Sequence, residues 1–346
     1  MMRTFECRVY LLKNGVRYKE LTPTESCTVY ASSSGKIQTS MSGRFLAEDK
    51  GDWMTCEIQP IMLIDGREFP VGVFRAATVT RDAGDHGVID EIEAFDRGWL
   101  LQQAKTEKML HLSAGTNYIE AIEMLMASCG ISRILKTPTS YTLQTDREDW
   151  ETGTDYLTIV NQLLSEINYR DVWFNSDGFA VLEPALPPSA ANIRHTYDAE
   201  DIHSVLNREC TIKTDLFNKP NVFVVICSNP DLDDVMTAVA ENNDPLSPTS
   251  TIARKIRITS VTKVDNIASQ QALQAYANEL CSRSRISGET VTIKTAMMPG
   301  HGIGDTIALN HPDAKGLYEE TGWYLDLKAG EYMTHDLKKV VYEWTR

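Results

Sequence analysis

The sequence predicts a mainly β protein with an α/β insertion: two β modules, each a closed barrel or a sandwich, separated by a small module of helices and a hairpin. Three observations lead to this prediction. Short strand-like runs alternate with turn signals up to about residue 97, the apolar period then changes from two residues to about 3.6, and β patterning returns beyond a proline-rich stretch at residues 183–190. The 346 residues exceed the roughly 100–200 of one domain, which agrees with several modules.

The first module begins with the strongest hairpin signal of the chain. Asn14-Gly15 separates the strand-like runs 7–13 and 16–21, and both residues tolerate the positive φ angles of a type I′ turn. Asp65-Gly66 supplies a second turn of the same chemistry. Turns are also predicted at Ser33-Ser34-Gly35 and at Ser42-Gly43. Further strand-like runs cover residues 53–59, 61–64, 69–74, 77–80 and 88–95.

Two segments of the middle module repeat each other. Residues 115–126 and 153–164 share the pattern Gly-Thr-(Asn/Asp)-Tyr, followed by apolar residues at helical spacing. A Thr, Asn or Asp at each start can cap exposed amide groups, so two short amphipathic helices are expected, the first ending at Gly130. A hairpin is predicted next, with strands at 172–174 and 179–183 around a turn at 175–178.

A proline-rich linker separates this module from the next. The three prolines of residues 183–190 exclude a helix and a central strand there. The predicted boundaries are therefore 1–97 for the first β domain, 98–188 for the α/β insert and 189–346 for the second β domain.

The second β domain carries one expected helix, at about residues 267–283, with Leu273, Tyr276, Ala277 and Leu280 on its buried side. The acidic segment 229–248 is predicted to be a solvated excursion with one short helical turn, or else an arm that contacts a partner. Strands are predicted at residues 209–213, 221–227, 253–258, 291–294, 306–309, 323–327 and 339–344.

Composition argues against several classes of protein. The 34 basic and 48 acidic residues give a net charge of −14, which disfavours tight binding to nucleic acid. Arg3, Glu6 and Arg8 lie where a secretory signal needs an apolar core, and no run approaches the ~20 apolar residues of a membrane span. The seven cysteines are scattered, without a Cys-x-x-Cys pair, and are expected to be reduced and mostly buried in a cytosol-like environment.

Residues 297–305, MMPGHGIGD, combine three glycines with a histidine directly after a strand-like run. A dinucleotide loop needs a third glycine and a following helix, whereas here Asp305 occupies that position and Thr306 and Ile307 continue as a strand. A carboxylate at that point would repel phosphate. The segment is therefore predicted to be a glycine-rich connection between two strands.

The remaining candidates for chemistry are weak in the sequence. None of the seven histidines forms a zinc motif, and there is no Gly-x-Ser-x-Gly. His301 and His335 could meet across paired strands and form a general-base group with Asp305 or Asp336, although solvated turn residues are the favoured interpretation. Acidic pairs could serve glycoside cleavage only if the fold set them ~5–9.5 Å apart: Glu48 with Asp49, and Asp90, Glu91 and Glu93. No catalytic, cofactor-binding or metal-binding residue is assigned.

A set of segments, taken in order, resembles the baseplate hub proteins of phage tails and phage-derived contractile particles, the late control protein D-like family. The resemblance covers the chain from about residue 50 to its end. It rests on the two Gly-Thr helices and on residues 58–74, 94–96, 167–169, 177–178, 218–222 and 299–305. It implies two similar, tube-ring-like β-barrels and a homotrimer of pseudo-hexameric symmetry.

The resemblance also implies a role without catalysis. Such a hub joins the tail tube protein to the central spike protein, contacts neighbouring baseplate or distal tail proteins, and lets DNA or cargo pass. It would sit in the virion tail or a phage-like particle, a contractile injection system or prophage product, assembled in the bacterial cytoplasm. No cofactor, specific nucleic-acid binding or membrane insertion is expected. Because a strand-like run extends nearly to Arg346, any peptidoglycan-cleaving activity is expected to belong to another subunit.

Two functions of other classes compete with this interpretation. One is a cell-wall hydrolase that uses His301, His335 and Asp305, or an acidic pair. The other is a carbohydrate-binding tail component that uses an exposed tryptophan such as Trp53 or Trp150.

Overall fold

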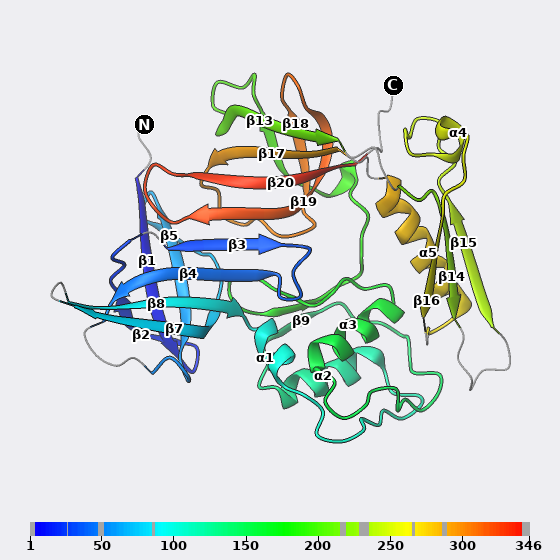
Figure 1. The fold of residues 1–346 in the computed structure, drawn as a ribbon, viewed down its shortest axis with the longest axis horizontal. Helices are drawn as coiled ribbons and strands as arrows, with labels where there is room; N and C mark the ends of the chain where they lie inside the picture. The colour runs from blue at the N-terminus through cyan, green and yellow to red at the C-terminus, as the bar shows by residue number, and fades with distance from the viewer. Residues whose placement is uncertain are drawn as a thin grey trace.

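The computed structural model describes residues 4–25, 27–47, 52–84, 87–214, 219–227, 235–264, 267–285 and 289–340, and the structural statements below concern these residues. One 14-stranded sheet runs through the protein, in the order β13-β17-β20-β19-β3-β4-β8-β7-β5-β1-β2, with β12, β18 and β6 attached beside this path. A helical insert and a smaller α/β unit flank the sheet (Figure 1). The mainly β fold with an α/β insertion is thus confirmed.

The first half of the sheet comes from the N-terminal strands. They are β1 (Phe5–Lys13), β2 (Val16–Leu21), β3 (Thr28–Ser32), β4 (Thr39–Leu46), β5 (Glu57–Ile64), β6 (Arg67–Pro70), β7 (Phe74–Gly84) and β8 (Gly87–Asp96). The predicted turns at Asn14-Gly15 and Asp65-Gly66 are confirmed, because both pairs have positive φ angles and join antiparallel strands.

The prediction of a turn at Ser42-Gly43 is wrong, since both residues lie inside β4. Met41, Gly43 and Phe45 alternate as buried residues along this strand. The ring of Phe45 covers Gly43, where an added Cβ would lie 2.8 Å from the ring. Glycine therefore makes room for an aromatic side chain here rather than for a turn.

The second half of the sheet contains β12 (Ile193–Asp198), β13 (Leu206–Thr214), β17 (Glu289–Ala296), β18 (Thr306–Asn310), β19 (Lys315–Asp326) and β20 (Tyr332–Val340). The two halves meet where β19 pairs antiparallel with β3, with Tyr324 opposite Tyr30. In Figure 1 the blue strand β3 lies beside the orange strand β19. Hydrogen bonding therefore continues from one half to the other without an edge between them.

The insert contains α1 (Gly98–Gln103), α2 (Tyr118–Ser128), α3 (Tyr156–Glu166), β9 (Ile134–Lys136), β10 (Trp173–Phe174) and β11 (Ala180–Leu182). Both predicted helices and the hairpin are confirmed. The side chain of Asn117 accepts hydrogen bonds at the start of α2, and Asp155 does so at the start of α3. Gly130, with φ 81°, follows the end of α2.

Between residues 222 and 285, the described residues form a separate α/β unit rather than strands of the large sheet. It consists of β14 (Val222–Cys227), β15 (Met236–Glu241), α4 (Thr251–Arg254), β16 (Thr259–Val264) and α5 (Gln270–Arg285). The predicted helix is confirmed as α5. The strand predicted at 253–258 is wrong, because the side chain of Ser250 caps the short helix α4 and the strand starts only at Thr259.

The acidic segment 229–248 is also only partly a solvated excursion. Its residues 236–241 form β15, which pairs along its whole length with β14. Residues 228–234 lie outside the described part of the chain. The buried positions of β15 are occupied by alanines, Ala238 and Ala240. Alanine gives only a weak alternating apolar pattern, which explains why the strand was not predicted.

Three buried clusters hold the molecule together. One joins the first half of the sheet to the adjoining parts of β19 and β20, a second lies within the second half, and the third is shared by the insert and the α5 unit. The predicted domain boundaries stay a prediction. All seven cysteines are present as thiols, and four of them are buried, as expected. Within the described residues, no helix has the length and hydropathy needed to cross a membrane.

Candidate functional site

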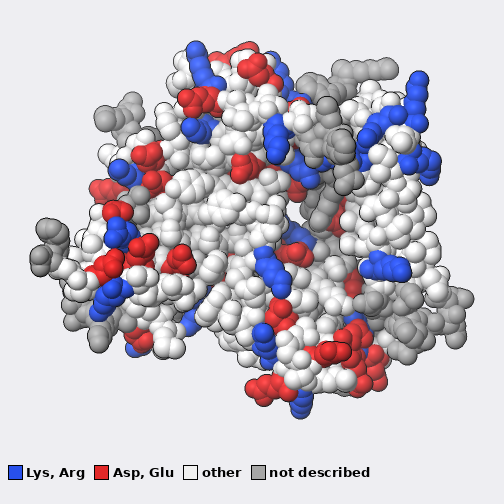
Figure 2. All heavy atoms as spheres, viewed as in Figure 1, with Lys and Arg blue, Asp and Glu red and all other residues white. Residues whose placement is uncertain are grey.

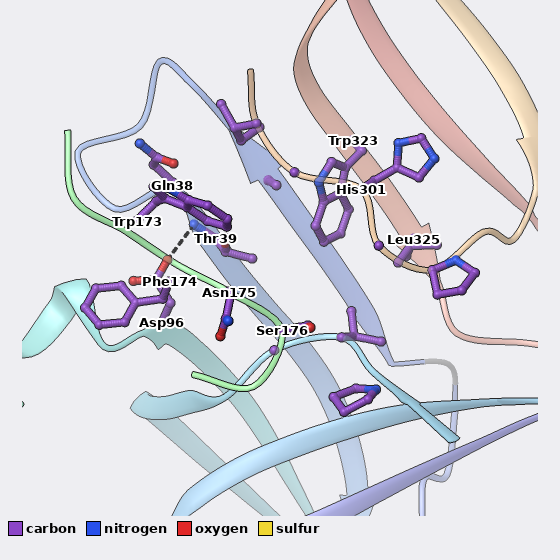
Figure 3. Close-up of a pocket in the computed structure, with 18 of the residues that line it drawn as sticks. Gln38, Thr39, Asp96, Trp173, Phe174, Asn175, Ser176, His301, Trp323 and Leu325 are labelled. Carbon is purple, nitrogen blue, oxygen red and sulfur yellow. Dashed lines mark hydrogen bonds between the residues drawn. The ribbon is translucent and has the colours of Figure 1, made fainter. Parts of the chain in front are cut away.

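A cavity of about 220 Å³ lies where the first half of the sheet, the insert hairpin and the glycine-rich loop 297–305 meet. Figure 3 shows hairpin residues Trp173, Asn175 and Ser176 on one side and Trp323 and Leu325 on the other. Its lining thus comes from segments that are far apart in the sequence. The cavity therefore lies at the junction between these modules.

Asp96, at the end of β8, contributes a carboxylate to this cavity. Its Oδ2 accepts a hydrogen bond from the amide of Thr39 at 2.9 Å, drawn in Figure 3, and Oδ1 accepts one from Gly98 at 2.8 Å. Burial raises the pKa of Asp96 to about 6, although both amide hydrogen bonds oppose the shift. Asp96 therefore links β4 to the first turn of α1.

The hairpin is attached to the sheet by Arg97. This guanidinium donates to both carboxylate oxygens of Glu57, on β5, and to the carbonyl oxygen of Gly178 at 2.7 Å. Gly178 has φ 74°, and a Cβ there would lie 2.8 Å from Cβ of Val73. Glycine is required at this position both for the backbone angle and for the close approach.

The loop 297–305 joins β17 to β18, so the prediction of a glycine-rich connection is confirmed. Gly300 and Gly304 have φ angles of 86° and 82°. Asp305 closes the loop by accepting a hydrogen bond from the amide of Gly302 at 2.8 Å. The guanidinium of Arg170, from the insert, packs on Gly304 and donates to the carbonyl oxygen of Ile303. The loop therefore links the second half of the sheet to the insert.

A histidine–carboxylate cluster lies directly behind this loop. It consists of His301, Glu320 on β19 and His335 on β20. Nδ1 of His301 is 2.6 Å from Oε2 of Glu320, and Nδ1 of His335 is 2.6 Å from Oε1 of the same side chain. The exposed fraction of these three side chains is 0–1%. In Figure 3 the ring of His301 points away from the other labelled residues of the cavity.

Hydroxyl groups orient the far side of both imidazoles. The hydroxyl of Tyr197 lies 2.7 Å from Nε2 of His301, and that of Thr295 lies 2.9 Å from Nε2 of His335. His195 stacks on His301, with ring centroids 3.8 Å apart. Five segments of the second half of the sheet thus meet at one buried polar cluster.

The orientation of the Thr295 hydroxyl is coupled to the tautomer of His335. When Thr295 donates its hydrogen to the carbonyl oxygen of Ala296, 2.8 Å away, Nε2 of His335 carries the proton in their mutual hydrogen bond. In neutral His335, the lone pair of Nδ1 then faces Oε1 of Glu320. Two electron-pair donors at 2.6 Å need a proton or a cation between them.

Burial dominates the electrostatics of the cluster. It lowers the pKa of His301 to about 4 and lowers the pKa of His335. Burial raises the pKa of Glu320 to about 7, although the contact with His335 opposes this. Asp305 and Asp336 raise the pKa of Glu320 further. Burial thus disfavours a charge on each of the three groups, and the nearby acids further disfavour a negative charge on Glu320.

The structure brings His301 and His335 together, with ring centroids 4.5 Å apart. The favoured interpretation is wrong, because both side chains are buried and are not solvated turn residues. The carboxylate between them is Glu320 and neither Asp305 nor Asp336. Asp336 is exposed and accepts from Thr292, and Asp305 lies 4.0 Å from His195.

The other sequence candidates do not converge on a cleft. Asp90 is buried against Arg81, whereas Glu91 and Glu93 are exposed on the opposite face of β8. His86, Glu48 and Asp49 lie outside the described residues. Trp150, expected to be exposed, is 3% exposed and donates to Gln162. Trp53 is half-buried and donates to Asp90.

Sequence reasoning missed Glu320, Tyr197 and Thr295. Glu320 lies in β19 in an alternation with buried Tyr318, and such an inward-facing acid is a signal that was available. Tyr197 belongs to β12, a strand that was not predicted. Its pairing with β18 is parallel and comes from a distant segment, so no hairpin signal marks it.

Comparison with protein-family models finds no match, and comparison with curated proteins finds none. Solved structures do match. A tail protein from Neisseria meningitidis MC58 has a TM-score of 0.67 and 14% identity, covering 96% of this chain and 97% of that chain. The 43 kDa tail protein of prophage MuSo2 from Shewanella oneidensis has a TM-score of 0.67 and 8% identity, covering 97% and 99%.

A more distant match is an Escherichia coli component of the type VI secretion system, described as structurally similar to bacteriophage T4 tail proteins. Its TM-score is 0.55 at 11% identity, covering 96% of this chain and 77% of that chain. At these identities the likeness concerns the fold. The fold implied by the resemblance to the phage hub family is therefore confirmed.

Proposed function

We propose that this protein is a structural hub of a phage tail baseplate or tail tip, or of a related contractile particle. In this proposal three copies form a pseudo-hexameric ring that joins the tail tube to the central spike and lets DNA or cargo pass. The observation that supports it most is the shared fold with two tail proteins, one of them from a prophage, over at least 96% of each chain.

The arrangement of the large sheet supports a symmetry-matching role. Two halves, built by β1 to β8 and by β12, β13 and β17 to β20, lie side by side in one continuous sheet. Three copies related by a threefold axis would place six such halves around a ring. A hexameric tube could then contact equivalent halves, while a trimeric spike contacts whole chains.

The surface has properties that suit such contacts. Figure 2 shows that charged side chains gather toward the periphery of this face, whereas the area over β3 and β19 is largely uncharged. Tyr30 and Tyr324, paired across the junction of the two halves, are 47% and 39% exposed. Exposed tyrosines are typical of protein interfaces. Neighbouring subunits of a tail would cover such residues.

Net charge supports a conduit that does not hold nucleic acid. A charge of −14 per chain repels phosphate groups, so DNA that passes through the ring would not be retained. The proposed location is the virion tail, after assembly in the bacterial cytoplasm. The proposed partners are further copies of this chain, the tail tube protein, the central spike protein and adjacent baseplate proteins.

The role is proposed to be mechanical rather than catalytic. The histidine–carboxylate cluster is the arrangement most similar to a general-base site, but its side chains are 0–1% exposed. A cell-wall polymer would have to reach it through packed strands. No described observation favours the hydrolase or the carbohydrate-binding alternative over the hub.

Light scattering coupled to size exclusion tests the proposal, first on the chain alone and then with the tail tube and spike proteins encoded beside it. The expected result is a species of about three times 38.8 kDa, seen as a ring by electron microscopy. A chain that stays monomeric with both partners present would refute the hub. Release of fragments from purified peptidoglycan would instead support the hydrolase.

A further inference from the structure

We propose that His301, Glu320 and His335 form a closed structural site for one divalent transition-metal ion of the zinc type. This inference does not depend on the proposed function, because it concerns the interior of one chain. Their ligand atoms lie within 4.8 Å of one another, and no ion is present in the structure.

The donor set suits such an ion. Nδ1 of each imidazole and one carboxylate oxygen of Glu320 give three donor atoms, two nitrogen and one oxygen, around one small space. Two imidazoles and a carboxylate are ligands that zinc prefers, and three protein ligands leave one tetrahedral position open. Because the three side chains are 0–1% exposed, no substrate could reach that position, so a bound ion would be structural rather than catalytic.

The surrounding residues are arranged as supports for metal ligands. In metal sites the second ring nitrogen of each histidine is commonly held by a hydrogen bond that fixes its orientation. Tyr197 and Thr295 supply such contacts to His301 and His335. For His335, the tautomer whose protonated Nε2 donates to Thr295 leaves the Nδ1 lone pair directed at Glu320. For His301 a change of tautomer, with Nε2 donating to Tyr197, would free Nδ1 in the same way.

The negative charge of the Glu320 carboxylate also favours a bound cation. Among the contacts of the described residues, Glu320 meets imidazoles and no Lys or Arg side chain. An unpaired buried carboxylate is costly, so either a proton or a metal ion must lie in the cluster. A proton can bridge one N···O contact, whereas a metal ion can be shared by both.

Binding requires a small rearrangement. Zinc bonds of about 2.0–2.2 Å place tetrahedral ligand atoms about 3.3–3.6 Å apart, so the present 2.6 Å contacts must widen by roughly 0.7–1.0 Å. Glu320 and His335 lie on neighbouring strands, and His301 lies on the loop 297–305, which can adjust to them. A bound ion would fix this loop, and with it the contact of Arg170, to the second half of the sheet.

Metal analysis of the full chain tests the proposal. The protein is purified without a polyhistidine tag, and its zinc content is measured by mass spectrometry before and after treatment with a chelator. We expect about one equivalent, a lower Tm after removal, and recovery of Tm on adding Zn²⁺ but not Mg²⁺. A second probe is Co²⁺, whose visible absorption reports four-coordinate nitrogen and oxygen ligation.

Matched variants separate this site from adventitious binding. Glu320→Gln and His335→Asn should abolish stoichiometric binding, and Tyr197→Phe, which keeps all three ligands, should weaken affinity about 10–100-fold. His203→Asn, at an exposed histidine outside the cluster, should bind like the wild type. Wild-type protein that neither retains nor takes up Zn²⁺ or Co²⁺ would overturn the proposal. So would undiminished binding by folded His335→Asn or Tyr197→Phe protein.

Discussion

Arg97 and Glu57 form a buried, two-pronged ion pair, with N···O distances of 2.7 and 2.8 Å and side chains 10% exposed. The pair joins β5 to the residue that follows β8, and Arg97 also donates to the hairpin at Gly178. On the surface such an ion pair would contribute little to stability, whereas this buried pair links three segments next to the cavity.

Replacing Arg97 with Met should lower the free energy of unfolding by about 3–5 kcal/mol, because it leaves the carboxylate of Glu57 buried without a partner. Chemical denaturation measures this. Arg257→Met, which breaks an ion pair whose arginine is 59% exposed, should cost less than about 1 kcal/mol. The double variant Arg97→Met/Glu57→Leu should regain much of the loss. Equal costs for Arg97 and Arg257 would contradict this account.

Gly178→Ala should be far more costly than Gly153→Ala. Both glycines have positive φ angles, 74° and 94°, so each substitution carries the ~1–2 kcal/mol of a strained backbone. Only at Gly178 would the new Cβ meet Val73, at 2.8 Å, which adds about 1–3 kcal/mol. The difference in midpoint between the two variants in urea measures the close packing of hairpin and sheet. Identical midpoints would show that the hairpin can move away.

The hydroxyl of Tyr118 donates to Oε2 of Glu166 at 2.8 Å, and Arg147 donates to both oxygens of the same carboxylate at 2.7 and 3.0 Å. Tyr118→Phe should therefore cost about 1.5–3 kcal/mol, since a buried charged acceptor loses one donor. Tyr332→Phe, at a tyrosine that is 50% exposed, should change stability by less than about 0.5 kcal/mol. Thermal unfolding followed by calorimetry compares the two variants. A Tyr118→Phe variant as stable as the wild type would contradict the prediction.

Asp96 should make stability fall as pH rises from about 4 to 7. Burial raises the pKa of this carboxyl from 3.8 to about 6, so the folded state binds the proton more tightly than the unfolded state. The stabilising contribution is complete below pH 3.8 and is lost as pH rises through 6, by up to about 3 kcal/mol. Asp96→Asn cannot titrate, so the difference between wild type and variant should change over this range. Parallel stability curves from pH 4 to 7 would contradict it.

Local chemistry made much of the fold predictable. Asn14-Gly15 and Asp65-Gly66 predict hairpins, because few residues accept their φ angles. Asn117 and Asp155 predict helix starts, because their side chains accept hydrogen bonds from free amides. Prediction failed where the pattern was ambiguous. Alanine, as in β15, is common in helices, and glycine, as in β4, is common in turns. Only pairing with a neighbouring strand makes these segments extended.

The candidate site could not be predicted in the same way. His301 and His335 were recognised as residues that could meet, but their shared carboxylate comes from β19 and their orienting hydroxyls from β12 and β17. The distance between two side chains on separate strands depends on register and on sheet curvature. Neither property is encoded in a short window of sequence.

By itself, the sequence determined the mainly β class, the hairpins, the capped helices and the acidic charge, because each follows from backbone angles, periodicity or composition within a few residues. Only the tertiary structure decided that β3 pairs with β19, that Trp150 is buried, and that Glu320 lies between two histidines. These features arise from contacts between segments that are distant in the chain, and burial then changes the protonation of the groups involved.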